Sequence, residues 1–250
     1  MKNVLLQKVI IILFSLLSIH CYAQDEPLRV GVANYSPPFV MRSARNGFFG
    51  FDISMMNYVC KSIHRTCQYS SMSFDDLIPG VQAQKVNVAV SAITITLERL
   101  NLVNFSIPYL PGHSRFLGSV ALSKQPFQVA LLENKKVGVE KGTIFAVQIK
   151  QLGLKGIEIV EYRNENDQIA ALSKQDIDFA LMDSLGAVYW QNQSGNTLAV
   201  AGEPIPFGLG YGIAIAQNNV ELTRSINQAL TDYLKSPQYR QDYQTYIAGF

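Results

Sequence analysis

The chain has 250 residues, of which 48% are hydrophobic and 16% are charged. This composition is typical of a globular protein with one large domain or two of ordinary size, and it excludes intrinsic disorder as the main state. The 21 basic residues include Lys2 and Lys8, so a chain without its first 23 residues has 19 basic and 19 acidic residues. Such a neutral chain lacks the clustered positive charge that nucleic acids and anionic membranes attract, so we expect neither as a partner.

The first 23 residues have the pattern of a secretory signal peptide. Two lysines precede an apolar run at residues 9–19, which is shorter than the ~20 residues that span a bilayer. Cys21 and Ala23 stand at the −3 and −1 positions for cleavage before Gln24. An alternative is lipid attachment at Cys21, which is disfavoured because His20 stands where a small residue is usual.

Two cysteines, Cys60 and Cys67, remain after removal of the signal peptide. An even pair in an exported chain predicts a disulfide, here between the end of a helix and the start of a strand. The loop it closes is short, so we expect a stabilisation of roughly 2–3 kcal/mol. His64 and His113 form no zinc-type cluster with cysteines, so we expect no metal and no cofactor.

Strand and helix patterns alternate along the rest of the chain. The first set is a strand at 28–33, a turn at 34–39, a helix at 51–63, a strand at 67–72, a helix at 74–83 and a strand at 86–91. The second set is strands at 116–122 and 136–139, a helix at 143–152, a strand at 157–162, a helix at 165–173, a strand at 177–182, a helix at 184–191 and a strand at 198–201. A strand at 210–216 and helices at 221–235 and 238–247 close the chain.

Strands separated by helices predict an α/β fold with mainly parallel sheets flanked by helices. There are too many strands for one small sheet, and breaks near residues 108–112 and 202–206 enclose a central block. We therefore expect two lobes, the first formed by residues 24–110 and 206–250 and the second, inserted one by 111–205. Two hinge crossings would join them, and the default ligand site is the cleft at the strand ends.

Polar groups follow three of the predicted strands. Arg99 could hold a carboxylate with its planar fork, although spacing alone favours an exposed arginine paired with an acid such as Glu98. Thr143 follows a strand and Gly142, which suits either an anion cradle or a plain helix N-cap. Asp183 ends an apolar strand and suits either an ammonium group or a helix cap. Together the three groups match a zwitterion.

Several motifs occur in an order that is typical of one known family. They are residues 37–39, 50–52, 74–79, 94–96 with Arg99, 105–109, 137–139 with 142–143, and 177–178 with Asp183. Over residues 28–248 the chain resembles the periplasmic solute-binding proteins of polar amino acid ABC transporters, which include histidine-, lysine/arginine/ornithine-, arginine- and glutamine-binding proteins. The resemblance implies a two-lobed periplasmic-binding-protein fold, a periplasmic monomer, a free amino acid ligand, an inner-membrane ABC permease as partner and no catalysis.

By this resemblance, Arg99 clamps the ligand's α-carboxylate, and the Thr94 amide and the turn at Thr143 and Ile144 complete that site. This favours the binding role of each group over its structural alternative. The resemblance also gives Asp183 to the α-ammonium.

The remaining roles implied by the resemblance concern three further positions. Ser91 helps Asp183 to hold the ammonium, and Phe74 stacks on the ligand side chain. Cys60 and Cys67 stand where the histidine-binding branch has a disulfide.

The chain departs from the family pattern at the first strand. Many relatives have an aromatic residue where this chain has Ser36, while Tyr35 stands one position earlier. Either Tyr35 takes that role through a shifted loop or the pocket has one aromatic wall. Ala33 replaces an acid that many relatives carry.

Glu140 is the second departure, because the glutamine-binding branch has a lysine there. An acid at this strand end would attract a cationic side chain, with Asp52 as further support, so we favour arginine or lysine over glutamine. The alternative for Glu140 is a solvated strand-end charge. The alternatives for the whole chain are an enzyme similar to cyclohexadienyl dehydratases and a ligand-binding component of a sensor.

Overall fold

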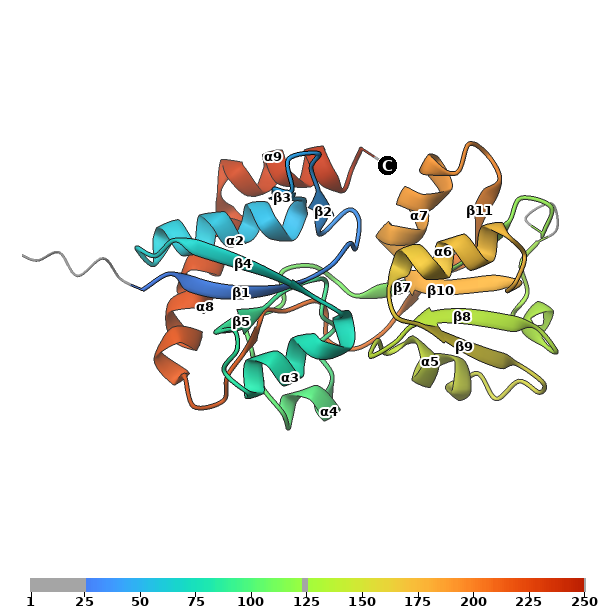
Figure 1. Cartoon of the computed structure of the whole chain (residues 1–250), viewed down its shortest axis with the longest axis horizontal. Coiled ribbons are helices and arrows are strands. Elements are labelled where there is room, and N and C mark those ends of the chain that lie inside the picture. Colours follow the sequence, from blue (N-terminus) through green and yellow to red (C-terminus); the bar gives the residue numbers. More distant parts are fainter. Residues whose placement is uncertain (1–25, 123–125, 250) are drawn as a thin grey trace, which may run out of the picture.

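The computed structural model describes residues 26–122 and 126–249 and places them in two lobes side by side (Figure 1). The predicted signal peptide, the cleavage before Gln24 and the alternative at Cys21 lie outside the described residues. No helix in the described part of the chain has the length and apolar character needed to cross a membrane.

The first lobe is built on a five-stranded sheet with strand order β4-β1-β5-β12-β6. Strand β1 lies inside the sheet and pairs in parallel with β4 and β5, and β12 pairs antiparallel with β5 and β6. The strands are β1 (Leu28–Ala33), β4 (Cys67–Met72), β5 (Val88–Ala89), β6 (Asn104–Phe105) and β12 (Ala214–Ile215), and β2 (Met41–Arg42) and β3 (Phe48–Phe49) form a separate hairpin.

Helices cover both faces of this sheet, and each face has its own apolar core. Helices α2, α8 and α9 pack together on one side, and α3 packs on β1 and β5 on the other (Figure 1). The helices are α2 (Phe51–Ser62), the 3₁₀ turn η1 (Phe74–Asp76), α3 (Leu77–Gln82), α4 (Leu97–Leu100), α8 (Val220–Lys235) and α9 (Pro237–Tyr246).

The second lobe has a five-stranded sheet of order β11-β7-β10-β8-β9. Strand β8 pairs in parallel with β9 and β10, whereas β7 runs antiparallel to β10 and β11. The strands are β7 (His113–Ser119), β8 (Lys136–Glu140), β9 (Glu158–Tyr162), β10 (Phe179–Asp183) and β11 (Leu198–Pro206), with η3 (Val129–Leu132), α5 (Phe145–Gln151), α6 (Glu165–Ser173) and α7 (Ser184–Gln193) around them.

The expected two-lobed α/β fold is therefore confirmed, with one refinement in the sheets. Parallel pairs occupy the part of each sheet where strands alternate with helices, as the βαβ pattern predicts. The strands next to the crossings, β7, β11 and β12, pair antiparallel, so both sheets are mixed.

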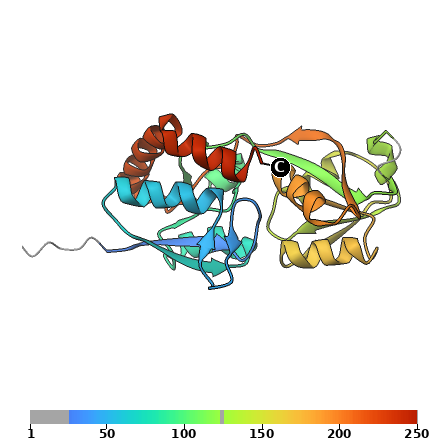
Figure 2. The same ribbon diagram turned by 90° about the horizontal axis from the view of Figure 1, so that it is seen from above.

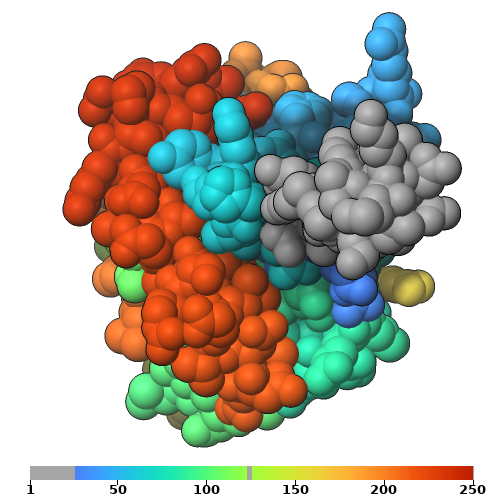
Figure 3. Space-filling view, turned by 90° about the vertical axis from the view of Figure 1, so that its left-hand side faces the viewer, coloured from blue at the N-terminus to red at the C-terminus, as the bar shows by residue number. Residues whose placement is uncertain are grey.

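The chain passes between the lobes on one side of the molecule, as the view from above shows (Figure 2). After the second lobe the chain returns to the first, where α8 and α9 (orange to red) lie beside the cyan segment that contains α2 (Figure 3). The first lobe thus contains both early and late parts of the chain. The lobe boundaries at residues 110 and 206 stay a prediction.

A disulfide joins the end of α2 to the start of β4, as the sequence indicated. Cys60 and Cys67 are bonded, with their Cα atoms 5.7 Å apart. The bond closes the short connection in which His64 has a positive φ of 59°. It lies on the first lobe and fixes the exit of a helix that packs against α8 and α9.

Candidate functional site

Three carboxylates gather at one edge of the second-lobe sheet. Strands β9, β8 and β10 are neighbours and run in the same direction, so their carboxyl ends meet. Glu140 ends β8, Asp183 ends β10, and Glu165 begins α6 three residues after β9. Glu140 and Glu165 are only 8% and 6% exposed. This edge is therefore acidic and shielded from solvent.

Arg99 faces this edge from the first lobe. Its backbone N–H is capped by the Thr96 hydroxyl at the start of α4, and its side chain is buried. Nη1 donates to the Thr94 carbonyl at 2.8 Å and Nη2 donates to the Gly142 carbonyl of the second lobe at 2.9 Å. The guanidinium carbon lies 5.6 Å from the centre of the Phe74 ring. Burial lowers the pKa of Arg99 to about 10, so it stays a cation at neutral pH.

The turn after β8 brings the lobes into close contact at Gly142. Its φ of +80° and the position of Asp75, whose Cα would lie 2.6 Å from an added Cβ, both require glycine there. The Thr143 hydroxyl donates to the Glu140 carbonyl at 2.5 Å, which closes the turn. Helix α5 then begins at Phe145 with Ile144 in the cap position, two residues later than predicted. Thr143 therefore closes a turn instead of capping the helix.

The lobes also touch through the turn after β1. The hydroxyls of Tyr35 and Tyr189 are 2.9 Å apart across the cleft. The Ser36 hydroxyl forms a hydrogen bond with the Glu165 side chain that lowers the pKa of this acid. Tyr35 and Ser36 thus both meet the second lobe, and the choice of which of them lines the ligand pocket stays a prediction. An ion pair between Lys141 and Asp75, at 3.1 Å, adds a contact at the rim.

Asp183 is the last residue of β10 and lies next to the segments that cross between the lobes. It stands at the N-cap of α7, but its side chain forms no capping hydrogen bond. It accepts a hydrogen bond from the Tyr211 hydroxyl instead. Burial raises the pKa of Asp183 to about 7, while Tyr211 and Arg99 lower it and Asp52 raises it. The Asp183 side chain is thus oriented by Tyr211, which lies near the second crossing, and not by α7.

Asp52 and Ser91 lie beneath the first-lobe face of the cleft. The Asp52 carboxylate is fully buried and accepts from the Ala92 N–H at 2.8 Å and from the Tyr109 hydroxyl at 2.9 Å. Burial raises its pKa to about 7. The Ser91 hydroxyl accepts from the Ala33 N–H at 2.8 Å. Both side chains hold the loop between β5 and α4, and neither contacts the acidic edge.

Glu165 is a site residue that the sequence analysis treated only as the start of a helix. Its carboxylate accepts a hydrogen bond from the Trp190 indole of α7. Burial raises its pKa to about 8, and the nearby Asp183 adds to this while Trp190 lowers it. Its position just after β9, beside the strand that ends at Glu140, is the signal that could have revealed it.

Glu140 differs from the other two acids because its carboxylate has no hydrogen-bond partner among the described residues. Burial raises its pKa to about 9, and Glu165, Asp183 and Asp75 contribute by repulsion. Its carboxylate oxygens are not fully enclosed, so an entering cation could reach them and would favour their charged form.

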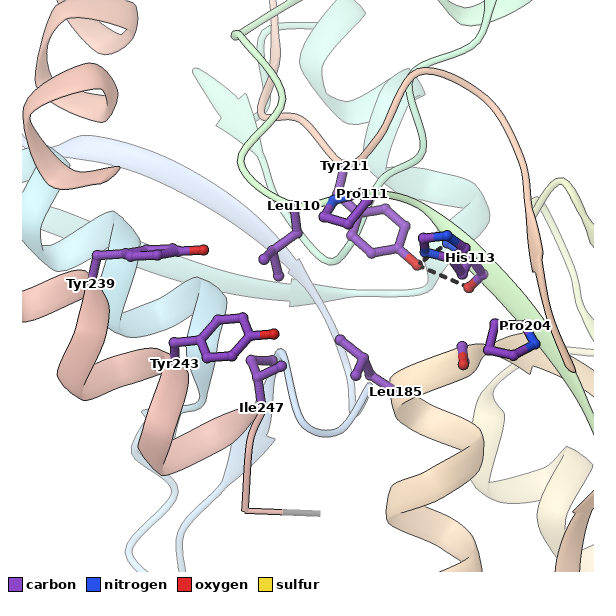
Figure 4. Close-up of a pocket in the computed structure, with 10 residues that line it drawn as sticks. Leu110, Pro111, His113, Leu185, Pro204, Tyr211, Tyr239, Tyr243 and Ile247 are labelled. Atoms are coloured by element: carbon purple, nitrogen blue, oxygen red, sulfur yellow. Dashed lines mark hydrogen bonds between the residues drawn. The ribbon is translucent and has the colours of Figure 1, made fainter. Parts of the chain in front are cut away.

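Several hollows adjoin the lobe junction, and two of them bear on the site. A groove of about 800 Å³ has Arg99, Thr143 and Ile144 in its wall. A smaller cavity of about 490 Å³ lies where Tyr239, Tyr243 and Ile247 face Leu185 and Pro204 (Figure 4). No predicted ligand residue lines the smaller cavity.

The smaller cavity still connects to the site through one hydroxyl. The Tyr211 hydroxyl forms hydrogen bonds with the backbone of His113 (Figure 4) and also donates to the Asp183 side chain. In the part of the chain that is described, no three histidine, cysteine or acidic side chains are grouped to hold a metal ion.

Residues 28–249 match the bacterial extracellular solute-binding proteins, family 3. The chain is 28% identical to the L-arginine-binding protein of Pseudomonas aeruginosa, over 94% of this chain and 93% of that protein. It is 30% identical to the lysine/arginine/ornithine-binding periplasmic protein of Escherichia coli, over 87% and 86%. A solved arginine periplasmic binding protein from Legionella pneumophila superposes with a TM-score of 0.82 at 29% identity, over 88% and 99%. The chain belongs to family 3 of the bacterial extracellular solute-binding proteins.

Proposed function

We propose that this protein binds a cationic L-amino acid, of the arginine or lysine type, in the cleft between its lobes. The observation that carries this proposal is the carboxylate of Glu140, a residue only 8% exposed, which lies near Asp183 and Glu165 and has no hydrogen-bond or ion-pair partner among the described residues. Arg99 would take the α-carboxylate, Asp183 the α-ammonium and Glu140 the distal cation. The names of the arginine-binding and lysine/arginine/ornithine-binding relatives support the same ligand class.

In this proposal the ligand enters the open cleft and first meets the first lobe. Arg99 holds its carboxylate through two parallel hydrogen bonds, and Phe74 packs along its side chain. Closure then brings Asp183, Thr143 and Ile144 onto it. Because the ligand contacts both lobes only when they are closed, it shifts the population to the closed form.

We further propose that the closed, loaded form works in the periplasm as a monomer and delivers the amino acid to an inner-membrane ABC permease. A sensor ectodomain is the competing partner. Pull-down with the permease in the presence of ligand, and none with the sensor ectodomain, is the expected result.

Thermal unfolding of residues 24–250 against the twenty amino acids, ornithine and citrulline tests the ligand class. A ligand at 100 times its Kd adds about 2.7 kcal/mol, which raises the Tm by several degrees. We expect the largest rise with arginine or lysine. A larger rise with glutamine would contradict the assignment of Glu140, and no rise with any of them would contradict amino acid binding.

We propose a binding protein and not an enzyme. The relatives named above are binding proteins. Incubation with prephenate or arogenate, followed by product analysis, should show no turnover, and turnover abolished by substitution of Asp183 would contradict this proposal.

A further inference from the structure

The acidic edge contains more carboxyl groups than one ligand cation requires. This inference rests on the proposed function and extends it. We propose that Glu140 and Glu165 form a two-carboxylate clamp for the distal cation of the ligand, and that the cation enters in exchange for a proton.

The first support is geometric. Strands β8 and β9 are paired in parallel, with Glu140 opposite Tyr162, so the acid that follows β9 comes next to the end of β8. A Cβ added at Gly186 would lie 3.5 Å from Glu165 Oε1 and 3.8 Å from Asp183 Cβ. Glu165 therefore lies at the start of α7, on the same edge as Asp183.

The second support is an aromatic wall around Glu165. The Trp190 indole donates to its carboxylate and fixes its orientation. The Trp190 ring lies 6.1 Å from that of Tyr35 and 5.5 Å from that of Tyr189. Aromatic rings beside carboxylates favour a guanidinium or ammonium group over a neutral amide.

The third support is the balance of charge. Glu140 is faced by Glu165 and Asp183 on its own sheet and by Asp75 from the first lobe. Asp75 is already paired with Lys141, and Arg99 is bonded to the backbone of both lobes. Among the described residues no cation is left for Glu140.

Burial, with repulsion from Glu165, Asp183 and Asp75, raises the pKa of Glu140 to about 9, and burial, with repulsion from Asp183, raises that of Glu165 to about 8, so both hold protons at neutral pH. Asp183 is the other acid that faces Glu165, and Tyr35 is the nearby phenol. An entering cation stabilises a carboxylate, and the displaced proton passes to the buffer. Charge is conserved, since one positive charge replaces another.

Titration calorimetry with L-arginine at pH 7, in phosphate and in Tris, counts this proton, because the two buffers differ in ionisation enthalpy. We expect about one proton released per arginine. L-citrulline, whose side chain has the same length and no charge, should release about one proton fewer per molecule than arginine. Equal proton counts for the two ligands, or no release with arginine, would overturn the exchange.

Variants then test the clamp. Glu165→Gln should weaken arginine binding by at least about 30-fold, because it removes one partner of a buried charge pair, and should change citrulline binding by less than about 3-fold. The matched control is Glu158→Gln, at an exposed position on β9, which should bind arginine as the unaltered protein does. Unchanged arginine affinity in Glu165→Gln would overturn the clamp.

Trp190→Phe tests whether Trp190 acts by orienting Glu165 or by its ring alone. The variant keeps an aromatic ring and removes the N–H that orients the Glu165 carboxylate. We expect several-fold weaker arginine binding with citrulline binding retained. Unaltered affinity and proton count would contradict the positioning role. Failure of the proposed function has a different outcome, namely no thermal shift with any basic amino acid, and it would remove the occupant of the clamp as well.

Discussion

The two faces of the cleft carry opposite kinds of ionisable group. The first-lobe face presents Arg99 next to the ring of Phe74. The second-lobe face presents Glu140, Glu165 and Asp183, all at the ends of neighbouring strands. Neither face alone complements an amino acid, because one lacks an acid for the ammonium and the other lacks a cation for the carboxylate. In the proposed function a zwitterionic ligand would therefore couple the faces, which is the requirement for a closure driven by binding.

The faces also differ in what supports them. On the first lobe, Asp52 and Ser91 bond backbone N–H groups and hold a loop from below. The acids of the second-lobe face are bonded directly, Glu165 by Trp190 and Asp183 by Tyr211 of the first lobe. The support of the first-lobe face thus fixes a backbone, and the support of the second-lobe face orients individual carboxylates. Substitutions in the two lobes should therefore have different consequences.

The largest effect is expected for Arg99→Gln. This variant removes the only first-lobe charge assigned to the ligand and leaves the Thr94 and Gly142 carbonyls without their donors. Arginine binding should weaken at least about 100-fold, or about 3 kcal/mol, by calorimetry. The control is Arg224→Gln on α8, an exposed position paired with Glu221, which should bind normally. Retained affinity in Arg99→Gln would refute the carboxylate role.

Removal of the disulfide tests whether the stability of the first lobe affects ligand binding in the cleft. Cys60→Ser combined with Cys67→Ser should lower the free energy of unfolding by roughly 2–3 kcal/mol, because the short loop regains its freedom in the unfolded chain. Urea denaturation measures this loss. Ligand affinity should stay within about 2-fold in folded protein, and a large loss of affinity would show that α2 and β4 influence the cleft.

The acidic face should make the ligand-free protein sensitive to pH. Folding raises the pKa of Glu140 from 4.5 to about 9, so the folded state binds this proton more tightly than the unfolded state. The contribution of Glu140 to the free energy of unfolding is therefore complete below pH 4.5 and is lost as pH rises towards 9. Between pH 5 and 9 the Tm should fall, and Glu140→Gln should reduce that fall by about 3 °C. Equal slopes for both proteins and for the Glu158→Gln control would contradict the buried state of Glu140.

Much of this site could be predicted from the residues that directly follow each predicted strand, because their positions depend on order along the chain. Parallel strands place Glu140 and Asp183 on one edge wherever the lobes stand, and the sequence fixes which residue follows each strand. Likewise, Arg99 and Thr94 are close in sequence and meet within one loop.

Contacts between distant segments were not accessible in this way. Glu165 meets Trp190 across 25 residues, and Asp183 meets Tyr211 across 28. Nothing local in the sequence links the members of these pairs. Asp52 shows a further limit of prediction from the sequence, because helical periodicity gives the face on which a side chain lies and not how far it is from the cleft. Its carboxylate bonds the Ala92 N–H beneath the loop instead of entering the cleft.

The smallest effect is expected at the rim, where Lys141 of the second lobe pairs with Asp75 of the first. The Lys141 side chain is 59% exposed, so solvent and salt screen this pair. Lys141→Ala should weaken arginine binding by less than about 3-fold, within the 1 kcal/mol or so that an exposed pair contributes. The difference from the unaltered protein should vanish in 1 M salt, where charges at the rim no longer interact. A loss as large as that of Arg99→Gln would mean that rim contacts, and not the buried charges of the two faces, hold the lobes together.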